Sequence, residues 1–289
     1  MAKVSVVIPA SNEIYLQQTI TELLTKSNDD TEVIAVLDGY WPDKPLEPDP
    51  RLVILHKPKG GMRSAINAGI DISKGKYIMK IDAHCNVAPN YDTALPADME
   101  DDWLVIPRRY SLEMADFSVR YERPIVDYEY LCNAYKIMNR DKIPELRAWK
   151  WNERTENRVN ILIDETMTFQ GSCWFANKEE FMKRVGYLND DPNGYGTFNS
   201  EAQELGLKYW LGGGKVMVNK KTWYAHLWKG KPYREKYLEL YGKTYARTGH
   251  NQRLNGIAYT VDFWMNNRWE NRIHDLEWLI DRFKPVPTW

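Results

Sequence analysis

The first 82 residues of this chain alternate between short apolar runs and segments with a helical repeat, and this alternation limits the available folds more than any other feature. The pattern predicts strands at residues 3–9, 31–37, 52–55 and 77–82, and amphipathic helices at 16–26 and 62–69. The strand-like runs are rich in β-branched residues, as is typical of strands buried on both faces. Strands that alternate with helices favour a mainly parallel sheet flanked by helices, so we predict an α/β fold.

Polar residues follow three of these predicted strands directly. They are the segment Pro9–Glu13, the pair Asp38-Gly39 and the corner Asp82-Ala83-His84. Ligands of open α/β sheets bind outside the carboxyl ends of the strands, so the three segments are expected to meet in one crevice. Taken alone, Asp38-Gly39 is equally typical of an ordinary turn.

The Asp82-Ala83-His84 corner carries a carboxylate and an imidazole two residues apart. Residues i and i+2 of an extended chain point to the same side, so both groups can face one object. A metal ion is one such object, and this pair suits Mn, Fe or Zn better than Mg or Ca. The alternative is a carboxylate that only fixes a histidine rotamer.

Composition excludes several classes of partner and compartment. The 289 residues include 39 basic and 40 acidic ones, so no global field draws the chain to nucleic acid or to an anionic membrane. Three cysteines are an odd number, which favours free thiols in a reducing compartment. Proline ends the first apolar run before it reaches signal-peptide length, and we find no window long enough to span a membrane. We expect a soluble cytoplasmic protein and leave its oligomeric state open.

The second half is less periodic. A strand is expected at 103–106, an irregular insertion without an assigned role at about 108–160, and an apolar segment at 166–176. Asn177 with Glu180, and Ser200 with Gln203, resemble helix-capping pairs, which places Glu201 in the first turn of a helix that ends at a run of three glycines. Two last strands are expected at 216–218 and 223–226.

From residue 227 the chain changes character, with eleven basic and seven acidic residues and twelve aromatic ones. Tyrosines recur every four residues, at Tyr233, Tyr237, Tyr241 and Tyr245, and would stripe one face of a helix. The stripe either packs on the rest of the protein or forms an aromatic and basic platform for an acceptor. We divide the chain into a catalytic domain at 1–226 and a helical extension at 227–289.

These motifs together resemble the GT-A glycosyltransferases of the family-two type, and over about residues 3–230 the polypeptide N-acetylgalactosaminyltransferases. The segments that carry the resemblance are Val6–Glu13, Asp38-Gly39, Gly61–Gly69, Asp82–Cys85, Gln170–Ala176 and Asn199–Gly214, with His226 at the place of a third metal ligand. The resemblance implies a Rossmann-like, mixed and mainly parallel sheet, and a helical, aromatic-rich C-terminal extension.

The resemblance also implies roles for individual residues. Asp82, His84 and His226 would hold Mn²⁺, with Mg²⁺ as the alternative, and the ion would bind the diphosphate of a UDP-sugar. Residues expected around the donor are Pro9, Ala10, Asn12, Glu13, Asp38, Arg63, Asp82, Gly171, Ser172 and Trp174. Arg63 and Glu201 are the candidate catalytic residues.

The chain departs from that family in two places. Inverting family-two enzymes place an acidic base where this chain has Phe198-Asn199, and Glu201 lies two positions further on. We therefore favour a retaining outcome, in which the departing phosphate takes the acceptor proton. The membrane anchor and C-terminal lectin module of the peptide-glycosylating relatives are not found in this sequence, so a secreted-peptide acceptor is not carried over.

The acceptor hydroxyl stays open at this point. Candidates are an envelope saccharide, a small molecule, a protein, or a hydroxymethylated base in DNA of the kind some bacteriophages make, bound through residues 227–289. A sugar-nucleotide nucleotidyltransferase would have a glycine-rich loop after its first strand, where this chain has Pro9–Glu13. A binding protein without catalysis would have no need of the Asp82, His84 and His226 set.

Overall fold

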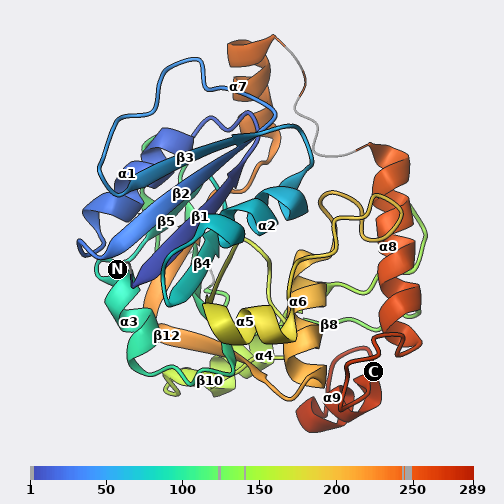
Figure 1. The fold of residues 1–289 in the computed structure, drawn as a ribbon. Coiled ribbons are helices and arrows are strands. Elements are labelled where there is room, and N and C mark those ends of the chain that lie inside the picture. The colour runs from blue at the N-terminus through green and yellow to red at the C-terminus, as the bar shows by residue number, and fades with distance from the viewer. Residues whose placement is uncertain (1–2, 123–124, 140, 243, 245–248) are drawn as a thin grey trace.

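The computed structural model describes residues 3–122, 125–139, 141–242, 244 and 249–289, which form a large mixed sheet with helices on both faces (Figure 1). The strands are β1 (Val4–Ala10), β2 (Thr31–Asp38), β3 (Leu52–Lys57), β4 (Tyr77–Ile81), β5 (Cys85–Val87), β6 (Trp103–Leu112), β7 (Val119–Arg120), β8 (Glu129–Leu131), β9 (Ala148–Lys150), β10 (Ile163–Glu165), β11 (Cys173–Asn177) and β12 (Lys215–His226). The helices are α1 (Leu16–Thr25), α2 (Met62–Ile72), α3 (Tyr91–Ala97), α4 (Asn152–Asn157), α5 (Lys178–Arg184), α6 (Glu201–Leu211), α7 (Lys231–Tyr241), α8 (His250–Met265) and α9 (Leu276–Phe283).

The large sheet has the order β10-β12-β6-β11-β4-β1-β2-β3, with β5 on β12 and β7 on β6. Strands β1 to β4 pair in parallel, whereas β11 is antiparallel to both β4 and β6. Because β12 is parallel to β6, these two reversals bring β12 back to the direction of β4. Strands β1, β2, β4 and β12 therefore all end at the same edge of the sheet. The predicted α/β fold with a mixed, mainly parallel sheet is confirmed.

Apolar side chains on the two faces of the sheet build two cores. Helices α1 and α3 cover one face, packing Leu16, Ile20 and Leu95 on it. Helices α2, α5, α6, α8 and α9 contribute to the core on the other face. Strands β1 and β2 are buried along their whole length, which is why both are mainly apolar in the sequence.

Three local expectations need correction. The two last strands are one strand, β12, in which the register with β6 shifts between Asn219 and Trp223, so that a bulge, rather than a turn, interrupts the apolar pattern. Ser200 does not cap α6, because its φ is 55° and its hydroxyl accepts a hydrogen bond from Thr260 instead. Helix α3 was not predicted, since it contains Pro96.

Other local expectations are confirmed. The Asn177 side chain caps α5 by accepting hydrogen bonds from the backbone N–H groups of Glu179 and Glu180. Glu201 begins α6. The region 108–160 is irregular, although β6 extends into it as far as Leu112 and β8 with β9 form a separate two-stranded sheet.

The C-terminal residues are helical, as predicted. Tyr233 and Tyr237 on α7 are buried in a cluster with Tyr15 and Phe117, so this part of the tyrosine stripe packs on the protein. Tyr245 lies outside the described residues. Helices α8 and α9 share the main core through Trp264 and Phe283, while α7 lies at the top of the view, at the other end of the molecule from α9 (Figure 1). In the described part of the chain, no helix combines the length and apolar character that a membrane span requires.

Candidate functional site

Three predicted ligand side chains meet at the edge where the parallel strands end. Asp82 and His84 follow β4, and His226 ends β12, opposite Cys85 of β5. The two Nε2 atoms of His84 and His226 are 3.1 Å apart, and they lie 3.7 Å and 3.4 Å from Oδ2 of Asp82. Ligand atoms bonded at about 2.1 Å to one ion are about 3.0 Å apart at a right angle and about 3.4 Å at a tetrahedral angle. The donor set therefore fits a single divalent ion.

The protonation states of this cluster suit metal binding. Burial lowers the pKa of His226 to about 3 and also lowers that of His84, so both imidazoles are neutral near pH 7. Burial alone would raise the pKa of Asp82, but the ammonium group of Lys80 holds it well below its usual value. Neutral imidazoles and an ionised carboxylate are the forms that bind metals.

Glu13 stands behind one of these ligands. Its Oε2 lies 3.4 Å from Nδ1 of His84, and its Oε1 lies 2.5 Å from Nζ of Lys229. Burial opposes ionisation of Glu13, yet Lys229 and His84 bring its pKa down to about 2. A carboxylate beside Nδ1 favours the tautomer that leaves Nε2 free for an ion, and Glu13 stands at this position next to His84.

A cavity of about 450 Å³ opens at this cluster. Its size lies within the range of pockets that hold nucleotides and other small ligands. The predicted site residues that line it are Pro9, Ala10, Glu13, Asp38, Asp82, His84 and His226. The expectation that the three strand-end segments converge on one crevice is met by these residues.

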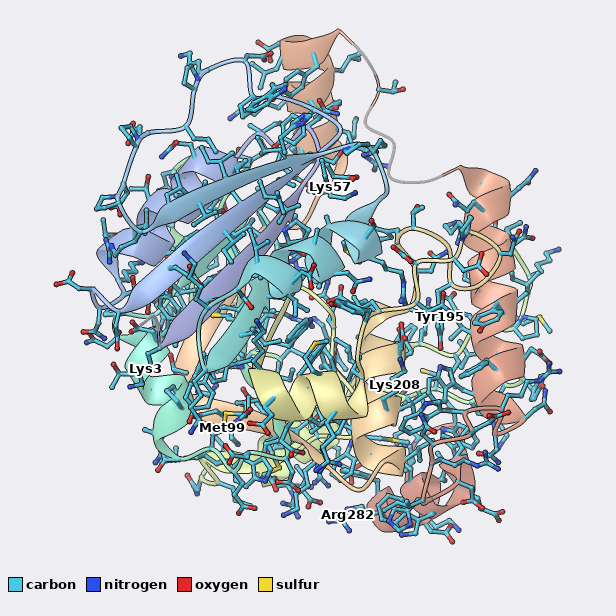
Figure 2. The ribbon with its side chains drawn as sticks, viewed as in Figure 1. Lys3, Lys57, Met99, Tyr195, Lys208 and Arg282 are labelled. Atoms are coloured by element: carbon cyan, nitrogen blue, oxygen red, sulfur yellow. The ribbon has the colours of Figure 1, made fainter. Side chains whose placement is uncertain are left out.

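Asp38 fixes the loop that forms one wall of the cavity. Its two carboxylate oxygens accept hydrogen bonds from the backbone N–H groups of Gly60 and Gly61, at 2.7 and 2.9 Å. Lys57, at the end of β3 (Figure 2), and Lys59 add ion pairs at 3.1 and 3.2 Å. Burial would raise the pKa of Asp38, but the Gly60 N–H and the two lysines lower it. Asp38 thus holds Gly61 at a φ of 90°, a conformation that favours glycine.

We expect Asp38→Ala to lower the free energy of unfolding by about 2 kcal/mol, because two N–H groups lose a charged acceptor. The matched variant Asp38→Asn keeps one acceptor oxygen and should lose about half as much. Urea denaturation followed by tryptophan fluorescence measures both. Equal midpoints for the native protein and both variants would show that this carboxylate does not hold the loop.

Six predicted site residues do not line the cavity. They are Asn12, Arg63, Gly171, Ser172, Trp174 and Glu201. Arg63 and Trp174 are fully buried, and Trp174 donates from Nε1 to Oε1 of Glu201 at 2.6 Å. Burial raises the pKa of Glu201, an effect that Lys80 and Trp174 partly offset. These residues lie below the cavity wall and support it. Their predicted contacts with the donor stay predictions.

Several lining residues were not predicted. The wall is completed by Gln170, Thr197, Phe198, Trp228, Lys229, Gly249 and Gln252, by Ser11 and Ala83, by Lys59, Gly60 and Gly61 of the loop before α2, and by Met62 and Ala65 of α2. The segments around Thr197 and Gly249 lack periodicity, so no sequence signal places them. The one signal available was a tryptophan and a lysine shortly after the third predicted ligand His226, at Trp228 and Lys229.

Comparison with known proteins agrees with this geometry. The model of the family described as glycosyl transferase family 2 matches residues 5–184. The chain belongs to glycosyl transferase family 2. Over 192 residues it is 30% identical to a chondroitin synthase of Pasteurella multocida (strain Pm70), covering 61% of this chain and 20% of the relative. It is 22% identical to a polypeptide N-acetylgalactosaminyltransferase homologue of Drosophila melanogaster, covering 98% of this chain and 56% of that protein.

A solved structure shares the fold of this family-2 glycosyltransferase. It is titled as a crystal structure of GalNAc-T7 with UDP, GalNAc and Mn²⁺, and it superposes with a TM-score of 0.70 at 16% identity. The match covers 92% of this chain and 49% of that one. The chain therefore spans about half or less of the length of these three proteins. The predicted GT-A fold and the resemblance to the N-acetylgalactosaminyltransferases are confirmed.

Proposed function

We propose that this chain transfers a sugar from a UDP-sugar to a hydroxyl acceptor, with Mn²⁺ held by Asp82, His84 and His226. The observation that carries the proposal is the set of three ligand atoms, 3.1 to 3.7 Å apart, on the wall of a cavity at the carboxyl edge of the sheet. Two histidines and one carboxylate are also typical of non-haem iron sites. Family membership, and a structure with the same fold titled with UDP and Mn²⁺, favour Mn²⁺ here, with Mg²⁺ as the alternative.

The bound ion would supply a Lewis acid to the leaving diphosphate. Lys59 and Lys229 line the same cavity and bring two ammonium groups to it. Lys229 is held beside the metal ligands by its ion pair with Glu13. These cations would bind phosphate oxygens and stabilise the negative charge that develops as the glycosidic bond breaks.

A retaining outcome is part of the proposal. Three carboxylates are among the described lining residues, and each is engaged. Glu13 pairs with Lys229, Asp38 binds the Gly60 and Gly61 N–H groups, and Asp82 belongs to the metal cluster. No further carboxylate lines the described wall to act as a base on the acceptor. This supports a reaction in which the departing phosphate receives the acceptor proton.

For the acceptor, two candidates rest on different observations. The basic and aromatic composition of residues 227–289 suits a hydroxymethylated base in DNA. However, Arg253, Arg268, Arg282 and Lys284 of that segment all pair with carboxylates. The similarity to a chondroitin synthase supports a growing saccharide chain instead, and we place this candidate first.

The proposal is tested by incubating the protein with UDP-glucose, UDP-galactose, UDP-N-acetylglucosamine and UDP-N-acetylgalactosamine, each with an oligosaccharide, a peptide and a hydroxymethylated DNA duplex. We expect one acceptor to gain the mass of one sugar with Mn²⁺ present, and to gain none with EDTA. NMR of the new glycosidic bond would show the same anomeric configuration as the donor. Neither transfer nor UDP-sugar hydrolysis under any of these conditions would overturn the proposal.

A further inference from the structure

Lys80 is a buried cation directly below the metal cluster. It lies on β4 among apolar residues, and its side chain is only 1% exposed. Its Nζ donates to Oδ1 of Asp82 at 2.7 Å and to the backbone oxygen of Gly171 at 2.5 Å, and it pairs with Oε2 of Glu201 at 3.2 Å. All three N–H bonds of the ammonium group are therefore used, and its position is fixed.

The contact with Asp82 separates the two oxygens of that carboxylate. Oδ1 faces Lys80, whereas Oδ2 faces the Nε2 atoms of His84 and His226. The backbone of Asp82 is fixed as well, by its N–H bond to the Ser172 oxygen at 2.9 Å. Rotation of the carboxylate would break the bond to Lys80, so only Oδ2 is presented to an ion.

We propose that Lys80 is a positioning residue that holds Asp82 as a one-oxygen ligand aimed at the two histidines. The inference rests on the proposed function, because it assumes that this cluster binds a divalent ion. The same inference assigns a role to Glu201, which acts by holding Lys80 and not by contacting a ligand in the cavity. Glu201 supplies the counter-charge that keeps the buried ammonium in place.

The neighbours of Glu201 fix it in turn. Its Oε1 accepts a hydrogen bond from Trp174, which lies opposite Lys80 in the pairing of β11 with β4. The Trp174 ring stacks on Phe181 of α5, with the ring centroids 5.1 Å apart. A chain of contacts thus runs from the core through Trp174, Glu201 and Lys80 to the metal ligand.

A purely structural role for Lys80 is the competing explanation, and a charge-matched substitution separates the two. Replacing Lys80 alone would leave Glu201 buried without its cation and would also change the field at the metal cluster. The double variant Lys80→Met/Glu201→Gln removes one positive and one negative charge together. The summed charge below Asp82 is unchanged, and the hydrogen bond that orients Oδ1 is lost.

We expect this double variant to bind Mn²⁺ about 10- to 100-fold more weakly than the native chain, as is typical when a group that orients a metal ligand is removed. Titration of Mn²⁺ followed by the electron paramagnetic resonance signal of the free ion measures this without any turnover. Circular dichroism and thermal melting check the fold. The control is Lys221→Met/Asp98→Asn, which deletes an exposed pair with a 2.7 Å contact and should leave Mn²⁺ binding unchanged.

The outcomes separate the inference from the function. If the native chain binds Mn²⁺ and the double variant binds it within threefold of the native affinity, the positioning role of Lys80 is overturned and the proposed function is not. A native chain that binds no Mn²⁺ would overturn the proposed function and this inference together. Weak binding by the double variant, with its melting temperature close to the native one, would support the positioning role.

A second comparison keeps the inference testable if the double variant does not fold. An ammonium group only donates, so in Asp82→Asn the amide oxygen must turn to Lys80 and the NH₂ group faces the histidines. We therefore expect Asp82→Asn to bind Mn²⁺ no better than Asp82→Ala. Binding by the asparagine variant more than tenfold tighter than by the alanine variant would show that Lys80 does not control this side chain.

Discussion

Replacing His226 with alanine is expected to lower Mn²⁺-dependent hydrolysis of the UDP-sugar donor more than about 100-fold and to leave the circular dichroism spectrum unchanged. In the proposed site His226 supplies one of three ligand atoms, and the remaining pair, Asp82 and His84, follows a different strand. When the ligand from β12 is lost, no other residue of the described cluster can replace it. Asp82→Ala should have an effect of similar size, since it removes the one negative charge among the ligands.

His274→Ala is the matched control for His226→Ala. His274 stacks on Trp278 with the ring centroids 3.8 Å apart, and it does not line the cavity, so activity should stay at the native level. Hydrolysis is followed by release of UDP, and Mn²⁺ binding by titration of the free ion. Normal turnover by His226→Ala would mean that the third ligand is misassigned.

Several of the cavity residues can be predicted from the sequence, because the strands that they follow are parallel. Asp38 and Asp82 each follow an apolar run, and parallel runs end at a common edge, so their approach to one cavity follows from local patterns alone. His226 is different, because its strand returns to the same direction only after two antiparallel pairings. Nothing in the residues near His226 encodes those pairings, and only the family resemblance pointed to it.

The buried residues below the metal cluster, such as Lys80, are also hard to predict from the sequence, because their partners lie far away along the chain. Lys80 stands at the end of an apolar strand, where a lysine usually marks a strand leaving the core, yet this side chain is buried by partners 91 and 121 residues away. Part of the cavity wall comes from Thr197 and Phe198 and from Gly249, and the sequences around these residues have no period. Local sequence patterns predict helices, strands and strand ends. Contacts between residues far apart in the chain decide which polar groups are buried.

The burial of Arg63 is likewise not predicted by the local sequence. Because the residue is buried, we expect its substitution to have a large effect on stability. Its guanidinium group is fully buried, donates to the backbone oxygens of Asn199 and Asn189 at 2.6 to 3.0 Å, and forms an ion pair with Glu204. The ring of Tyr195, labelled in Figure 2, lies 4.4 Å from it. We expect Arg63→Met to lower the free energy of unfolding by about 3 kcal/mol, because it leaves a buried carboxylate and two carbonyl groups without their donor. The value lies at the lower end for such pairs, since Lys208 still contacts Glu204 at 2.7 Å.

Urea denaturation of Arg63→Met and of Arg63→Met/Glu204→Gln tests this role against a direct one at the donor. If Arg63 is structural, the double variant should recover part of the lost stability, because the unpaired buried charge is gone. The bonds to Asn199 also hold the loop that carries Thr197 and Phe198 to the cavity, so the KM for the donor should rise in step with the loss of stability. A donor-contacting arginine would give the opposite pattern, with UDP binding lost in Arg63→Met at native stability. Arg63 is the second residue of α2 and does not line the cavity, whereas its neighbours Met62 and Ala65 do, and this position favours the structural result.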